Sequence, residues 1–190
     1  MKYSKLEIPD VILCEPLIHN DYRGFVYESY KKKSFEEFLG FEVKFCQDNI
    51  LYNNHGVIRG LHTNTSSFAQ SKLVSVLKGK ILDVAVDFRV GSSTFGKSVS
   101  VELSSENKKQ LFIPKGFLHG FSVLSEDALV LIKIDNYLAN GQSIGVKYDD
   151  EFLNIDWKIP KEKVILSFAD KELNDFKEDL SPFIYGESFY

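Results

Sequence analysis

Residues 72–88 read KLVSVLKGKILDVAVDF and contain two apolar runs on either side of the turn KGK at 78–80. Both runs are rich in valine, leucine and isoleucine, and the β-branched members of this set favour strands. In the second run, Asp83, Ala85 and Asp87 fall on one face, at the two-residue period of a strand. The stretch therefore predicts two β-strands joined by a short turn.

Short runs of the same kind continue on both sides of this stretch. Turn segments such as VGSSTFG, PKGF and SED separate them at the spacing typical of sandwiches and barrels. The sequence thus predicts an all-β fold, an antiparallel barrel or jelly roll. The expected strands occupy residues 43–50, 56–63, 72–79, 80–88, 98–104, 109–114, 120–125 and 128–135.

Helical signals are few and short. In residues 34–40, Ser34 is the expected N-cap, Glu37 completes a capping box with it, and Gly40 ends the helix. Residues 170–180 suggest a second short helix.

The length of 190 residues fits one domain. We expect a single domain over residues 1–190, with an N-terminal arm at about 1–50, a barrel core at about 51–137 and a C-terminal segment at about 138–190. Cys14 and Cys46 are the only cysteines, and we expect both to be small buried residues.

Composition and charge narrow the possible partners. The net charge of -4 gives no basic footprint for nucleic acid. No apolar run reaches membrane-spanning length, and the N-terminus MKYSKLEIPD lacks the hydrophobic region of a signal peptide. We therefore expect a cytoplasmic protein that binds neither nucleic acid nor membranes.

Four basic side chains stand out among the apolar strands. Arg59 and His62 share one expected strand, Lys72 opens another, and His119 follows the turn PKGF. Taken singly, a strand histidine is usually structural and a lysine at a strand start is usually solvated. Taken together, they lie on neighbouring strands of a small barrel, and barrel mouths are common ligand sites.

A metal site is not the expected use of these histidines. Small barrels of the cupin type bind metal through an H-x-H pair, a nearby Glu and a later His. Here Thr63 and Asn64 follow His62, and no acidic residue appears before Asp83. Two histidines alone rarely hold a transition metal firmly, so we expect a cupin-shaped barrel with neither metal nor cofactor.

The remaining chemistry is acid–base work at a carbon beside a carbonyl. The chain lacks the G-x-S-x-G, Walker and G-x-G-x-x-G motifs of other enzyme classes. A histidine held by a carboxylate is a good base near neutral pH. A lysine or second histidine can stabilise the enolate oxygen that develops, and an arginine fork matches a diphosphate.

Several segments, in order and spacing over nearly the whole chain, resemble the dTDP-4-dehydrorhamnose 3,5-epimerases. They are DYRGFVYESY (21–30), QDN (47–49), GVIRGLH (56–62), SKLVSVLKGKILDVAVDFRVGSSTFGK (71–97), LSSENKKQLFIPKGFLHGFSVLSEDA (103–128) and NIDW (154–157). The resemblance implies a metal-free, cupin-type jelly roll that forms homodimers by exchanging N-terminal strands. It also implies epimerisation of dTDP-4-keto-6-deoxy-D-glucose at C3 and C5 through enolates, in rhamnose-type deoxysugar biosynthesis.

The same resemblance implies roles for individual residues. His62 is the implied base, Asp170 pairs with it, Lys72 stabilises the enolate oxygen, and His119 lies in the sugar pocket. The implied substrate contacts are Arg23 and Arg59 for the diphosphate, Glu28, Gln47 and Asn49 for the nucleotide or sugar, and Phe25 near the base.

One departure from the family affects the chemistry directly. The family's catalytic tyrosine, the candidate proton donor, aligns with Ile132, which has no proton to give. Tyr137 or water is a possible replacement, although positions 132 and 137 point to opposite faces of a regular strand unless the chain bends after Asp135. Thr63, Asn64 and Ala169 also replace residue types that the family usually has, which are an aromatic, a Gln and a basic residue.

These departures leave several functions open. The chain is expected to be an epimerase, acting at both carbons or at C3 only. A sugar-nucleotide-binding cupin without turnover and a cupin of the 3,4-ketoisomerase type are the alternatives.

Overall fold

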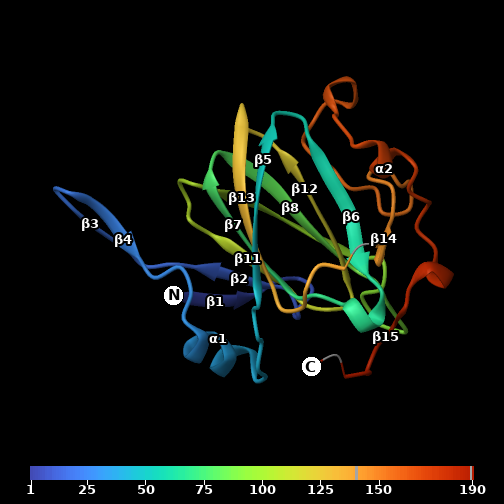
Figure 1. The fold of residues 1–190 in the computed structure, drawn as a ribbon, viewed down its shortest axis with the longest axis horizontal. Helices are drawn as coiled ribbons and strands as arrows, with labels where there is room; N and C mark the ends of the chain where they lie inside the picture. Colours follow the sequence, from blue (N-terminus) through green and yellow to red (C-terminus); the bar gives the residue numbers. More distant parts are fainter. Residues whose placement is uncertain (140, 189) are drawn as a thin grey trace.

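Two antiparallel sheets face each other and form the body of the molecule (Figure 1). The six-stranded sheet has the order β1-β2-β11-β7-β13-β5, and the five-stranded sheet has the order β10-β8-β12-β6-β14. This computed structural model describes residues 1–139, 141–188 and 190, and for Ser66 the backbone only. The arrangement confirms the predicted all-β fold, a cupin-type jelly roll.

The strands follow the predicted series with shifted ends. The strands are β1 Lys2–Lys5, β2 Ile12–Glu15, β3 Ile18–Asp21, β4 Gly24–Tyr27, β5 Gln47–Asn54, β6 Ile58–Asn64, β7 Lys72–Lys78, β8 Lys80–Asp87, β9 Arg89–Val90, β10 Ser98–Ser104, β11 Gln110–Ile113, β12 Phe117–Val123, β13 Asp127–Ile134, β14 Ser143–Gly145 and β15 Phe183–Ile184. The helices are α1 Lys32–Leu39 and α2 Phe168–Lys171, with 3₁₀ turns at Ser66–Phe68, Lys161–Lys163 and Glu178–Leu180.

Gly79 carries the chain from one sheet to the other. The predicted strands on either side of it form as β7 and β8, but β7 belongs to the six-stranded sheet and β8 to the five-stranded sheet. Gly79 has φ +78°, and a Cβ there would lie 2.0 Å from the carbonyl oxygen of Asp127. The turn therefore requires glycine, for its conformation and for the close approach of the neighbouring strand.

Strand β8 is buried on both faces. Ile81 and Ala85 pack into the core between the sheets, whereas Leu82 and Val84 pack into a second cluster outside the five-stranded sheet. The C-terminal segment supplies the outer side of that second cluster, with Trp157 among its buried residues. The tail thus covers one face of the sheet that carries His62 and His119.

The helix α1 covers one end of the six-stranded sheet. Phe35 is 1% exposed and meets Phe112 edge-on, with ring centroids 5.1 Å apart. Gly40 ends the helix as predicted, with φ +82° and its N–H donating to the Glu36 carbonyl. The predicted N-cap was wrong: Lys31 holds that position without a side-chain bond, because the helix begins two residues before Ser34.

Two further expectations were wrong. The helix expected over residues 170–180 is reduced to α2 and a 3₁₀ turn, because Asn174 instead makes a backbone bridge to Val146. Cys14 is buried as expected, but Cys46 is exposed. The segment around Cys46 alternates in burial, and the cysteine falls on its solvent side.

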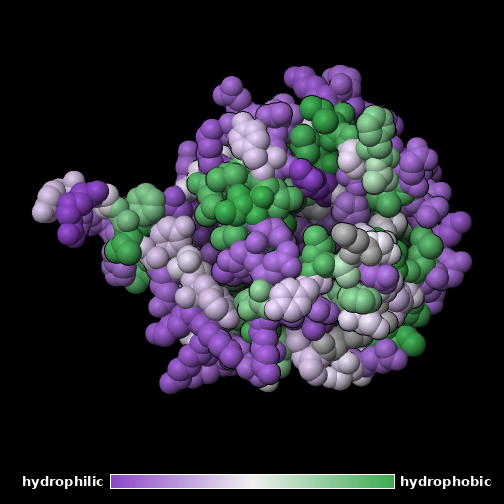
Figure 2. All heavy atoms as spheres, viewed as in Figure 1, coloured by the Kyte–Doolittle hydropathy of each residue, from purple (hydrophilic) through white to green (hydrophobic). Residues whose placement is uncertain are grey.

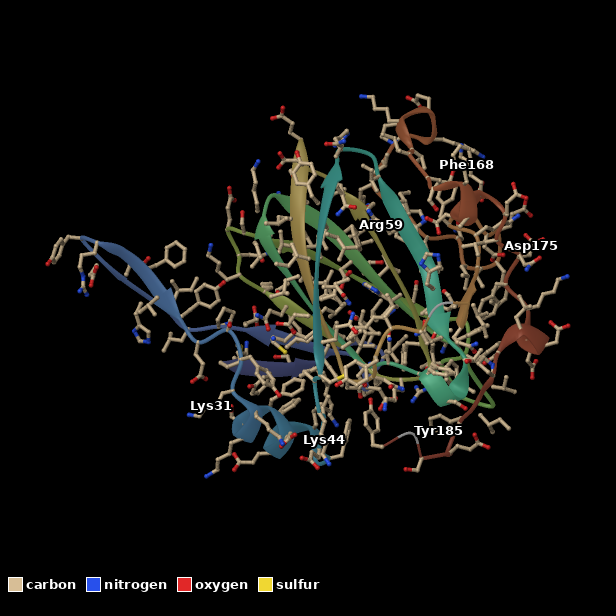
Figure 3. The ribbon with its side chains drawn as sticks, viewed as in Figure 1. Lys31, Lys44, Arg59, Phe168, Asp175 and Tyr185 are labelled. Atoms are coloured by element: carbon tan, nitrogen blue, oxygen red, sulfur yellow. The ribbon has the colours of Figure 1, made fainter. Side chains whose placement is uncertain are left out.

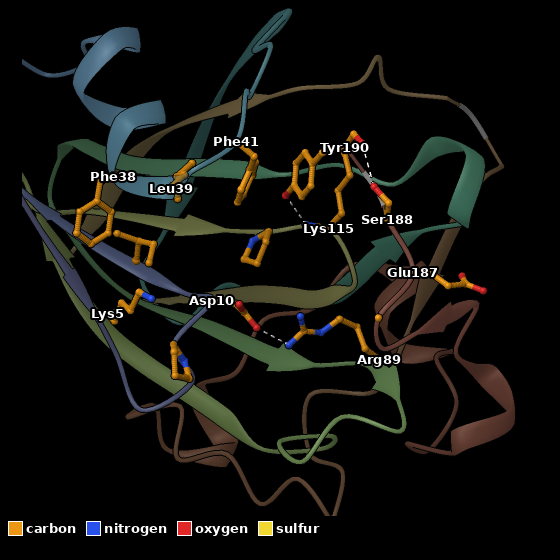
Figure 4. A pocket seen from close by; sticks show the side chains of 14 residues that line it. Lys5, Asp10, Phe38, Leu39, Phe41, Arg89, Lys115, Glu187, Ser188 and Tyr190 are labelled. Atoms are coloured by element: carbon orange, nitrogen blue, oxygen red, sulfur yellow. Dashed lines mark hydrogen bonds and ion pairs between the residues drawn. The ribbon is translucent and has the colours of Figure 1, made fainter.

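Near the N-terminus a hairpin extends beyond the jelly roll, and at the C-terminus the last residue packs against it. The β3–β4 hairpin projects away from the sheets (Figure 1). At the C-terminus, the ring of Tyr190 lies 4.3 Å from that of Phe41, and its hydroxyl accepts a hydrogen bond from the Lys115 N–H (Figure 4). Among the described residues, no helix is long and apolar enough to cross a membrane.

We predict that Phe35→Ala destabilises the fold by about 3–5 kcal/mol, because it leaves a cavity between α1 and the sheet. Phe168→Ala is the control, since Phe168 is 89% exposed and its loss is expected to change stability by less than about 0.5 kcal/mol. Chemical denaturation followed by fluorescence measures both. Equal effects of the two substitutions would show that α1 is not packed as described.

Candidate active site

A cavity of about 650 Å³ lies between the two sheets. Six of the predicted site residues line it, together with Ile132 at the position of the missing tyrosine; they are Asn49, Arg59, His62, Lys72, His119 and Asp170. The five-stranded sheet supplies Arg59 and both histidines, and the six-stranded sheet supplies Lys72 and Ile132. Figure 3 shows the α2 residue Phe168 on the side of the molecule away from the hairpin, with Arg59 nearer the middle.

Close pairing of β6 and β12 brings the two histidines together. His62 and His119 are direct partners in the antiparallel register, and the register shifts between His119 and Phe121. A Cβ at Gly60 would lie 2.6 Å from the His119 carbonyl oxygen, so only glycine permits this approach. In a regular strand, side chains three residues apart point to opposite faces. The register shift allows Arg59 and His62 to line the same cavity nevertheless.

His62 forms a close pair with a buried carboxylate. Its Nε2 lies 2.6 Å from Oδ1 of Asp170, whose side chain is 6% exposed, while His62 is 36% exposed. The hydroxyl of Ser167 caps α2 and accepts the Asp170 N–H at 3.0 Å, which fixes the carboxylate. Burial alone would raise the pKa of Asp170, but the hydrogen bond and charge of His62 outweigh it and hold that pKa below its usual range.

A second carboxylate–imidazole pair lies deeper in the cavity wall. His119 Nε2 is 2.8 Å from Asp83 Oδ1, with side chains 5% and 0% exposed. Burial raises the pKa of Asp83 and lowers that of His119, since both charged forms are desolvated. The pairing of Asp83 with His119 was not predicted from the sequence. A carboxylate on the same strand face as Ala85, within an apolar run, was a signal for it.

Lys72 is the ammonium group beside these pairs. Its Nζ lies 3.5 Å from the backbone carbonyl of His62. Burial lowers the pKa of Lys72 to about 8, and the charge of Asp83 opposes this shift. A lysine with this pKa is protonated at neutral pH and still gives up its proton readily.

The mouth of the cavity carries polar side chains in a fixed arrangement. Arg59 Nε donates to Asn53 Oδ1 at 2.6 Å. Asn49 lines the cavity, and its Oδ1 accepts a hydrogen bond from Gln47 Nε2 at 2.8 Å. Gln47 thus orients the Asn49 side chain.

The position of the family tyrosine is apolar here. Ile132 is 9% exposed and lines the cavity. Strand β13 ends at Ile134, and Tyr137 follows with 68% of its surface exposed. Leu138, and not Tyr137, is among the cavity's lining residues.

Three predicted substrate contacts lie in or beside the β3–β4 hairpin, away from this cavity. Arg23 and Phe25 are in the β3–β4 hairpin, where they line a separate depression, and Glu28 follows it. Arg23 forms its ion pair with Asp21 of the same hairpin. Within one chain, therefore, the structure does not bring these residues to His62.

The described residues contain no group of three or more His, Cys, Asp or Glu side chains placed to hold a metal ion.

Comparison with known proteins places the chain in a family. A family profile for dTDP-4-dehydrorhamnose 3,5-epimerase matches residues 5–178. The chain belongs to this family. The dTDP-4-dehydrorhamnose 3,5-epimerase of Shigella flexneri is 47% identical over 177 residues, which cover 93% of this chain and 96% of that protein. The predicted resemblance and the assignment to the epimerases, a class of isomerase, are thus confirmed.

Two solved structures show the range of the family. The Legionella pneumophila dTDP-6-deoxy-D-glucose-3,5-epimerase in complex with dTDP-4-keto-L-rhamnose is 42% identical, with a TM-score of 0.91 and coverage of 97% of this chain and 99% of that one. The 3'-monoepimerase ChmJ of Streptomyces bikiniensis, in complex with dTDP-quinovose, is 28% identical, with a TM-score of 0.84 and coverage of 90% and 86%. Relatives of this fold therefore include enzymes named for one and for two inverted carbons.

We predict that Asp170→Asn lowers epimerase activity by about 100-fold or more, because the amide cannot stabilise an imidazolium as the carboxylate does. Asp175→Asn is the matched control, five residues away and 60% exposed in a surface pair with Lys147. Initial rates at saturating substrate measure both. Wild-type activity in Asp170→Asn would show that the His62–Asp170 pair is not required for catalysis.

Proposed function

We propose that the protein epimerises a dTDP-linked 4-keto-6-deoxyhexose at a carbon next to the ketone, in rhamnose-type deoxysugar biosynthesis. The observation that carries this proposal is the close pair of His62 and Asp170, 2.6 Å apart, in the wall of a cavity that also contains Lys72. This set suits removal of a proton beside a carbonyl and is retained together in a member of an epimerase family.

We infer separate tasks for these groups. Asp170 accepts the proton on Nε2 of His62, which leaves Nδ1 as the basic nitrogen that removes the substrate proton. The negative charge then moves to the C4 oxygen, where the Lys72 ammonium stabilises it in a poorly solvated site. Arg59 at the mouth is placed to bind the diphosphate through its guanidinium.

The apolar residue at position 132 changes how the second proton is supplied. Epimerisation requires a proton removed from one face of a carbon and a proton delivered to the other. With Ile132 in place of the usual tyrosine, one donor for that delivery is lost. We propose that this chain, like the 3'-monoepimerase of the same fold, inverts C3 and leaves C5 unchanged.

The working protein is proposed to be a homodimer. Ile50 and Tyr52 of β5 and Leu77 of β7 are 62%, 59% and 45% exposed, and Figure 2 shows hydrophobic atoms gathered over β5 and β13. Gln110 lines a groove with Leu77, and its buried Oε1 has no hydrogen-bond partner among the described residues. A second copy covering this surface would satisfy both features.

A dimer also offers a role for the projecting β3–β4 hairpin. The β3–β4 hairpin carries Arg23 and Phe25 away from their own cavity, with Glu28 just beyond it (Figure 1). The family resemblance implies exchange of N-terminal strands, so we propose that the hairpin of one subunit completes the nucleotide site of the other.

We predict that the wild-type protein exchanges and inverts the C3 proton of dTDP-4-keto-6-deoxy-D-glucose in heavy water and leaves the C5 proton in place. Proton NMR of the sugar measures this directly. His62→Ala is expected to lose about 10²–10⁴-fold in exchange, because the base is removed, while it keeps its affinity for dTDP.

The other outcomes of this experiment are equally informative. Inversion at both carbons would contradict the C3 restriction. Binding of dTDP without exchange at either carbon would contradict the enzymatic proposal and support a sugar-nucleotide-binding protein. A 3-keto product would support a 3,4-ketoisomerase.

We predict that the purified protein has twice the 21.7 kDa mass of one chain, as measured by size exclusion with light scattering. Leu77→Glu places a charge on the proposed interface and is expected to give monomers. Ile184→Glu is the control, since Ile184 is 55% exposed in the separate β9–β15 pair and its variant is expected to stay dimeric. A wild-type monomer would overturn the dimer proposal.

A further inference from the structure

The structure raises the question of which group donates the second proton. His62 projects from the five-stranded sheet. The wall opposite it is formed by the six-stranded sheet, through Asn49, Lys72, Ile132 and Ile134. A proton delivered to the face of the carbon away from His62 must come from that side of the cavity.

Lys72 is the one member of this opposite wall, as far as the described lining residues go, with a proton that it can release near neutral pH. An amide such as Asn49 does not titrate in this range, and the isoleucines have no acidic proton. In the register of the sheet, Lys72 is the direct partner of Ile134, which lies two residues beyond Ile132. The ammonium therefore shares a sheet face with position 132 and sits next to it.

We propose that Lys72 is the acid that delivers a proton to the carbon face opposite His62, in the role that a tyrosine at position 132 has in the family. This inference rests on the proposed function. It gives Lys72 a task beyond stabilising the enolate oxygen.

The surroundings of Lys72 suit an acid. Its neighbours on the adjacent strands β11 and β13 are Ile113 and Ile134, both apolar. The charged or titratable groups that face it are Asp83 from β8, His119 from β12, Arg59 and His62 from β6, and Asp170 from α2. With a pKa of about 8, the ammonium is a much stronger acid than an exposed lysine.

His119 is a weaker candidate for this task. It is the direct strand partner of His62, so it lies on the same sheet as the base. Its Nε2 is also engaged by Asp83 at 2.8 Å. A group from the hairpin of a second subunit is the other rival, and the experiment below separates it from Lys72.

The step balances without a co-reactant. His62 takes the proton from C3, and the electrons of the broken C–H bond form the C3=C4 double bond of the enolate. Lys72 then donates a proton to C3 from the opposite face, and the ketone re-forms. The imidazolium releases its proton to water and the neutral amine takes one from water, so the only net change is inverted configuration.

The first test uses the wild-type protein and compares two rates across pH. In heavy water, His62 can return a deuteron to its own face, which gives exchange without inversion, whereas inversion needs the second acid. We expect the ratio of inversion to exchange to be constant below pH 8 and to fall about tenfold per pH unit above it, as Lys72 loses its proton. A ratio that stays constant to pH 10 overturns the proposal, because a lysine that only stabilises the enolate affects both rates equally.

The second test separates charge from acidity. Lys72→Arg keeps the positive charge but holds its proton too tightly to donate it. We expect inversion to fall by about 100-fold or more while exchange stays within about tenfold of wild type. Adding Ile132→Tyr to this variant is expected to restore inversion, since it returns the family's proton donor.

Lys78→Arg, on the same strand but paired with Asp127 at the surface, is the control and is expected to behave as wild type. Normal inversion in Lys72→Arg assigns the proton to another group, such as the partner's hairpin, and overturns the proposal. An absence of exchange in the wild-type protein contradicts the proposed function itself, and so is distinguishable from a failure of the Lys72 assignment.

Discussion

The site depends on two carboxylates that are buried against imidazoles between the sheets. Asp83 and Asp170 are almost wholly removed from solvent, and each is paired with a histidine of the five-stranded sheet at 2.8 Å and 2.6 Å respectively. A buried carboxylate is stable only with such a partner, so these contacts fix the orientation of both histidines. The close approach of β6 and β12 at Gly60 then places the histidines side by side.

The two sheets contribute different chemistry to the cavity. The five-stranded sheet carries both histidines and Asp83, and the six-stranded sheet carries one ammonium group among apolar side chains. Ile132 stands where the family resemblance implies a tyrosine, and it makes the wall formed by the six-stranded sheet still less polar. The protein can lack the tyrosine hydroxyl and still hold an acid in this wall. The acid is Lys72, because burial lowers the pKa of its ammonium to about 8.

Much of the fold followed from local patterns. The alternation in residues 72–88 and the recurrent turns predicted eight of the eleven strands of the two sheets, all except β1, β2 and β14, because side-chain period and turn chemistry are local properties. The transfer of the chain between sheets at Gly79 depends on contact with Asp127, nearly fifty residues away, and no local pattern carries it. The helix expected at 170–180 failed for a similar reason, since pairing of Asn174 with Val146 overrides local preference.

The candidate site was partly predictable. The co-occurrence of Arg59, His62 and Lys72 and the family motifs pointed to the cavity, but the Asp83–His119 pair appears only once β8 and β12 are paired. A single turnover of C3-deuterated substrate in ordinary water tests whether groups on two faces invert C3. We expect inverted product with solvent hydrogen at C3. Inverted product that keeps the deuterium would contradict inversion by two groups.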